Sequence, residues 1–121
     1  MVMKRIEIEV LKPSDALAAF AETWRHAAAR GKAATARLVF GSLGALFSAI
    51  TQKRLELVRY AAAHKGLNTR KLAQALGRNY KNVHTDVAAL TELGLLDKDS
   101  RGNLSVPFDE IVIRAGIREA A

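Results

Sequence analysis

Apolar and polar residues alternate at the start of the chain. Ile6, Ile8 and Val10 are separated by Glu7 and Glu9, a period of two that predicts a strand over residues 6–10 with one buried face. A helical period follows, from a possible N-cap at Ser14 to Gly31. Its apolar stripe predicts an amphipathic helix and comprises Leu17, Phe20, Ala21, Trp24 and Ala28.

The same region predicts a second strand and a second helix. Residues 38–40 (Leu-Val-Phe) read as a short buried strand, and Ser42 can cap a helix whose apolar positions are Leu43, Leu46, Phe47 and Ile50. Residues 1–50 are therefore predicted to form a strand-helix-strand-helix arm.

Three short helical patterns fill the middle of the chain. Thr51, Thr69 and Asn79 are the predicted N-caps, and the first two helices are predicted to end near Gly66 and Gly77. Gly94 is predicted to close the third. The inward positions are predicted to be Leu55, Val58 and Ala62 in the first helix, Leu72, Ala73 and Leu76 in the second, and Val83, Val87 and Leu90 in the third.

A hairpin is predicted after the third helix. Leu95 and Leu96 lead into it, residues 99–103 are rich in turn formers, and Leu104, Val106 and Phe108 alternate on the return. Three helices followed by a β-ribbon is the order of a winged helix-turn-helix, and the short link at Gly77 and Arg78 matches its turn. The fold class is thus predicted as α+β, mainly helical, with an N-terminal arm at 1–50, a winged domain at 51–113 and a tail at 114–121.

Charge points to an anionic partner. The 121 residues have a net charge of +7, and residues 51–86 alone contain eight basic and two acidic residues, a net +6. Such a cluster is either a solvated basic face or a phosphate-binding one. The absence of cysteine excludes disulfides and thiolate chemistry. We expect no signal peptide and no membrane segment, and therefore a cytoplasmic protein.

Four segments carry a resemblance to a known family: residues 54–57 (Arg-Leu-Glu-Leu), 69–78, 80–84 (Tyr-Lys-Asn-Val-His) and 90–95. Over roughly residues 50–113 the chain resembles the MarR-like winged-helix DNA-binding regulators. Residues 80–84 and 106–111 resemble a closer subgroup that includes antitoxin-type regulators. The resemblance implies dimeric, sequence-specific binding to double-stranded DNA.

Candidate DNA contacts follow from the predicted third helix. At about 100° per residue its outward face presents Lys81 and Thr85, flanked by Asn82 and His84, which can meet base edges and phosphates. His84 could instead only cover its own helix. Arg70 and Lys71 in the first turn of the preceding helix are predicted phosphate contacts, and Arg101 with Lys98 would extend the wing to the DNA. The set is completed by Arg78, Asn79 and Tyr80, the last with its hydroxyl toward a phosphate; Arg54 and Arg59 are interpreted as solubilising residues.

Two classes of function remain, and they are compatible. The first is a homodimeric transcriptional regulator, an autorepressor, that pairs through residues 1–50 and places its third helix in the major groove. The second is an antitoxin whose N-terminal region neutralises a small toxin protein. An enzyme is disfavoured, because the sequence has no recognisable nucleophile constellation, phosphate-cradling loop or histidine pair; no cofactor, metal site or catalytic residue is expected.

Overall fold

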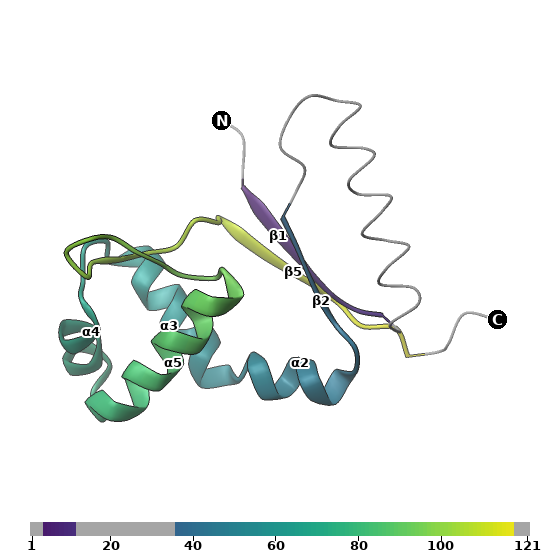
Figure 1. The fold of residues 1–121 in the computed structure, drawn as a ribbon, viewed down its shortest axis with the longest axis horizontal. Helices are drawn as coiled ribbons and strands as arrows, with labels where there is room; N and C mark the ends of the chain where they lie inside the picture. The colour runs from purple at the N-terminus through teal and green to yellow at the C-terminus, as the bar shows by residue number, and fades with distance from the viewer. Residues whose placement is uncertain (1–3, 12–35, 118–121) are drawn as a thin grey trace. The chain divides into compact units, whose positions relative to one another are not determined.

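The computed structural model describes residues 4–11 and 36–117 (Figure 1). They belong to two compact units, one that contains residues 4–11, 36–48 and 108–117 and one made of residues 49–107. The helix predicted over residues 14–31, with Trp24, lies outside the described residues. Strands and helices occur together, as the α+β prediction requires. In the described part of the chain, no helix has the length and apolar character needed to cross a membrane.

The first unit contains a three-stranded parallel sheet. Its order is β2 (Ala36–Phe40), β1 (Arg5–Val10), β5 (Glu110–Arg114), so β1 is central (Figure 1). Ile8 pairs in register with Leu38 on one side and Ile113 on the other, and is fully buried. The two strands predicted from the N-terminal pattern are confirmed. β5 was not predicted as a strand of this sheet, because its partner β1 lies about a hundred residues away along the chain.

Opposite charges pair across the other face of this sheet. Glu9 of β1 is only 7% exposed and accepts hydrogen bonds from Arg37 of β2 and Arg114 of β5. Arg5 and Glu110 form a further ion pair at 2.9 Å. These strands therefore neutralise their own charges and contribute little unpaired positive surface.

Helix α2 (Leu43–Ala49) follows β2 directly. Ser42 caps it as predicted, its hydroxyl oxygen accepting a hydrogen bond from the amide of Ala45 at 3.1 Å. Leu46 is buried, but Phe47 is 63% exposed and Leu43 40% exposed. Leu43 and Phe47, two of the four predicted apolar positions, are therefore exposed in the single chain.

The second unit has the predicted order of three helices and a hairpin. α3 (Gln52–Ala63), α4 (Thr69–Leu76) and α5 (Tyr80–Leu93) are followed by β3 (Asp97–Lys98) and β4 (Leu104–Ser105), which pair antiparallel. A bridge between Asn68 and Asn103 and a 2.8 Å hydrogen bond from the Leu104 amide to the Leu67 carbonyl tie the hairpin to the α3–α4 loop. This is a winged helix-turn-helix arrangement.

The buried residues of the second unit agree with the prediction for α5 and differ from it for α3. Val83, Val87 and Leu90 of α5 are buried as predicted. On α3 the predicted face is wrong at Ala62, which is exposed, and Leu55 is only half-buried. The buried residues of α3 are Leu57, Val58 and Ala61. The buried face of α3 is therefore turned about the helix axis by about one residue, roughly 100°, from the predicted face.

The domain limits predicted at residues 51 and 113 stay a prediction. The second compact unit ends at Pro107, and residues 110–114 pair with β1 in the first unit. Val106 and Phe108 therefore do not extend the wing, whose second strand stops at Ser105.

Most predicted helix caps are confirmed, with one exception. Thr51 and Asn79 cap α3 and α5, and Gly77 and Gly94 end α4 and α5 in the left-handed conformation, with φ of 65° and 84°. The cap of α4 is Asn68, not Thr69: the Asn68 side-chain oxygen accepts a hydrogen bond from the Lys71 amide at 2.8 Å. Thr69 is the first helical residue, and its buried hydroxyl has no hydrogen-bond partner among the described residues.

We expect Asn68→Ala and Thr69→Val to differ in stability. Removing the Asn68 cap leaves the amide of Lys71 unpaired and should lower the free energy of unfolding by about 1 kcal/mol. Thr69→Val replaces a buried, unpaired hydroxyl by a methyl group and should cost nothing or stabilise the unit slightly. Urea denaturation of both variants measures the difference. A larger loss of unfolding free energy for Thr69→Val than for Asn68→Ala would show that Thr69, and not Asn68, caps α4.

Candidate nucleic-acid interface

The α4–α5 corner fixes the direction of α5. Only Gly77, Arg78 and Asn79 separate the two helices. Gly77 takes up the positive φ, and the amide of Arg78 donates to the Ala73 carbonyl at 3.0 Å, which closes the end of α4. The chain can then reverse within three residues, and α5 leaves the corner with its apolar face toward the core.

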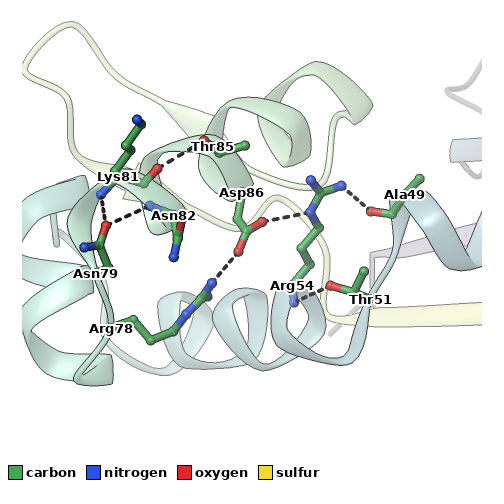
Figure 2. A network of polar contacts seen from close by, with 9 residues as sticks. All are labelled: Ala49, Thr51, Arg54, Arg78, Asn79, Lys81, Asn82, Thr85 and Asp86. Carbon is green, nitrogen blue, oxygen red and sulfur yellow. Dashed lines mark hydrogen bonds and ion pairs between the residues drawn. The ribbon is translucent and has the colours of Figure 1, made fainter.

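The first two turns of α5 present polar side chains to solvent. Lys81, Asn82, His84 and Thr85 are all exposed, as predicted, whereas Val83 between them is fully buried. The Thr85 hydroxyl donates to the Lys81 carbonyl at 3.1 Å (Figure 2). Among the described residues, no side-chain partner holds the ammonium group of Lys81 or the amide of Asn82. This exposed face can therefore offer hydrogen-bond donors and acceptors to a ligand.

Asn79 has a structural role at the start of this face. Its side-chain oxygen accepts hydrogen bonds from the amides of Lys81 and Asn82, at 2.9 and 3.3 Å (Figure 2). The predicted contact of Asn79 with DNA stays a prediction. Its oxygen serves to orient the first turn of α5.

Arg70, Tyr80 and His84 form a continuous surface cluster between α4 and α5. The Arg70 guanidinium carbon lies 4.4 Å from the centre of the Tyr80 ring, a cation–π contact. The ring of Tyr80, a residue that is 40% exposed, lies 5.8 Å from that of His84. The structure thus brings together three predicted site residues from two helices. Lys71 next to Arg70 is exposed.

A second cluster joins two arginines to one acid. Asp86 of α5 accepts hydrogen bonds from Arg54 of α3 at 3.0 Å and from Arg78 at 2.7 Å (Figure 2). The side chains of Arg54, Asp86 and Arg78 are 17%, 15% and 20% exposed. Arg54 also donates to the Ala49 carbonyl at 2.8 Å. Arg54 is therefore paired within the unit and is not a solubilising residue. Arg78 is likewise paired with a carboxylate, and its predicted contact with DNA stays a prediction.

The two arginines set the ionisation of Asp86. Burial alone would raise its pKa, but the hydrogen bonds and positive charges of Arg78 and Arg54 outweigh burial and hold the pKa of Asp86 below its ordinary value. The carboxylate is ionised at neutral pH. Sequence reasoning missed Asp86, although one signal was present: on a helix with core positions at 83, 87 and 90, residue 86 falls near the edge of the apolar face, where a carboxylate needs a partner.

The tip of the wing carries two exposed cations. Asp99 accepts hydrogen bonds from the amides of Arg101 and Asn103, both at 2.9 Å, and Gly102 has a φ of 84°, so the turn is tightly defined. Arg101 in this turn and Lys98 at the end of β3 are both exposed. They could reach an anion along the flank of a bound partner.

A shallow hollow lies between the start of α3 and the outer face of α5. It is lined by Thr51, Gln52, Lys53, Arg78, Asn82, Thr85 and Asp86. All of these lining residues are polar or charged, and two of them, Asn82 and Thr85, belong to the exposed face of α5. In residues 4–11 and 36–117, no group of three or more His, Cys, Asp or Glu side chains is arranged to hold a metal ion.

The fold and this surface define a winged helix-turn-helix protein with a polar, exposed face on α5, the third helix of the winged unit. The chain belongs to the HVO_A0114 family, whose model matches residues 49–113. Among solved structures it is similar to the multiple antibiotic-resistance repressor (MarR) from Listeria monocytogenes 4b F2365, with a TM-score of 0.46 and 18% identity; the match covers 77% of this chain and 60% of the repressor. Comparison with curated proteins gave no significant match.

Proposed function

We propose that the protein is a sequence-specific, double-stranded DNA-binding regulator that places α5 in the major groove. The observation that carries the proposal is the face of α5: Lys81, Asn82 and Thr85 are exposed on the first two turns of a helix that a short corner holds against α4. The net +6 of residues 51–86 supports it, since a positive surface attracts the phosphate backbone.

The contacts divide into two kinds. Lys81, Asn82 and Thr85, with His84 at their flank, would meet base edges, because they project from the N-terminal part of the third helix. Arg70, Lys71, Lys98 and Arg101 would bind phosphates, and Arg70 is already oriented by the ring of Tyr80. Bases would provide the sequence preference and phosphates the position on the duplex.

We further propose that the regulator acts as a homodimer through the unit that contains β1, in the cytoplasm, as an autorepressor. Support comes from apolar side chains of this unit that are exposed in the single chain: Leu43, Phe47 and Ile113. Two DNA-binding units on symmetric half-sites bind more tightly than one. The antitoxin alternative differs in requiring that this unit also bind a second protein, which co-purification with the product of the neighbouring gene would test.

We expect Asn82→Ala and Lys71→Ala to separate base reading from phosphate binding. A selection from genomic fragments first identifies the preferred duplex. Asn82→Ala should then weaken binding to that duplex by about 1–3 kcal/mol, relax the preference at one base position and leave binding to random DNA nearly unchanged. Lys71→Ala should weaken both alike, because a phosphate contact is independent of sequence.

Binding assays on the selected and a random duplex measure the contrast, with circular dichroism to confirm folding. Equal losses of Asn82→Ala on both duplexes would mean that another face of α5 meets the bases. No binding of the wild-type chain to either duplex would refute the proposed function itself.

A further inference from the structure

Asp86 uses both oxygens of its carboxylate to hold arginines. One oxygen accepts from Nε of Arg54 and the other from Nη2 of Arg78. Arg54 has a second anchor, the Ala49 carbonyl, whereas the side chain of Arg78 has Asp86 as its hydrogen-bond partner among the described residues. Asp86 therefore determines where the guanidinium of Arg78 lies.

Arg78 lies beside the proposed reading face. Its side chain lines the same hollow as Asn82 and Thr85. A guanidinium binds phosphate oxygens as well as carboxylate oxygens, and in the same forked geometry. An unpaired arginine at this position would add a strong contact to any duplex that α5 approaches, whatever its sequence.

The Arg78 guanidinium is held by Asp86 and is not available to bind phosphate. Its side chain is 20% exposed, and its Nη1 is fully buried with no hydrogen-bond partner among the described residues. A buried donor without a partner has a cost in free energy, so the orientation is not the one that best satisfies Arg78 alone. The ion pair with Asp86 is what keeps Arg78 there.

We propose that Asp86 is a specificity-determining residue: by holding Arg78 on its carboxylate, it keeps this cation off DNA phosphates and so limits sequence-independent binding. Asp86 acts through Arg78 and does not itself contact DNA. The inference rests on the proposed DNA binding, and it adds that one acidic residue near the interface lowers affinity for random DNA.

The test uses the full chain and a short random-sequence duplex over a range of salt concentrations. Asp86→Asn should bind this duplex several-fold more tightly than the wild type, with a plot of log affinity against log salt steeper by about 0.9 for each winged unit on the DNA. Arg78→Gln in the wild-type background should leave the slope unchanged, since Arg78 is already paired. The double variant should return the slope of Asp86→Asn to the wild-type value, which assigns the new contact to Arg78.

Three results would overturn the inference. One is an unchanged slope for a folded Asp86→Asn variant in a wild-type protein that binds DNA; this leaves the proposed function intact. Another is a flatter slope for Arg78→Gln alone, which would show that Arg78 already contacts phosphate; this arm decides the matter if Asp86→Asn does not fold. The third, a wild-type chain that does not bind duplex DNA, removes the proposed function and the inference with it.

Discussion

Raising the salt concentration from about 50 to about 200 mM is expected to weaken DNA binding by roughly a hundredfold for one winged unit, and by the square of that factor for two. Each phosphate contact releases counterions and contributes about 0.9 to the slope of log affinity against log salt. Arg70, Lys71, Lys98 and Arg101 would together give a slope of roughly 3.6 per unit. Fluorescence anisotropy with a labelled random duplex measures it.

Two variants serve as controls for this salt dependence. Lys71→Ala removes one proposed phosphate contact and should flatten the slope by about 0.9 per winged unit. Asn82→Ala replaces an uncharged side chain on the same surface and should leave the slope as in the wild type. A wild-type slope near zero would show that the basic residues of 51–86 form a solvated face and not a phosphate-binding one.

Local signals predicted much of the winged unit correctly. The N-caps Thr51 and Asn79, the terminal glycines Gly77 and Gly94, and the buried face of α5 each depend on residues within one or two helical turns. Hydrogen bonding at a helix end and the period of 3.6 residues both depend on residues that are close in sequence. A single sequence is therefore enough to predict the caps and the buried face.

Features that depend on distant partners were not predicted. β5 becomes a strand by pairing with β1, and no property of residues 110–114 alone names that partner. The candidate site shows the same division. The exposure of Lys81, Asn82 and Thr85 followed from the period of α5. The pairing of Arg54 with Asp86, in contrast, depends on how α3 packs near α5, and that of Arg78 depends on the geometry of the corner between α4 and α5. The net charge can be counted from the sequence. Which basic side chains are paired with a carboxylate is known only from the structure.

Helix α3 was ambiguous for a different reason. Leu55, Leu57, Val58, Ala61 and Ala62 provide two overlapping apolar stripes, both at helical spacing and both including Val58. The pattern of one helix cannot choose between them when each would bury leucine and alanine. Packing in the second unit selects Leu57 and Ala61.

Leu57→Ala is expected to lower the free energy of unfolding by about 2–5 kcal/mol, and Leu55→Ala by much less. Leu57 is fully buried, so truncation removes apolar contacts and leaves a cavity. Leu55 lies two positions away in the same helix and is half-buried. Its truncation therefore removes fewer apolar contacts and leaves a smaller cavity. Both variants carry the same change of helix propensity, which therefore cancels in the comparison. Urea denaturation of the full chain, followed by far-UV circular dichroism, measures the two losses. A larger loss for Leu55→Ala would mean that α3 packs on the stripe of Leu55, Val58 and Ala62.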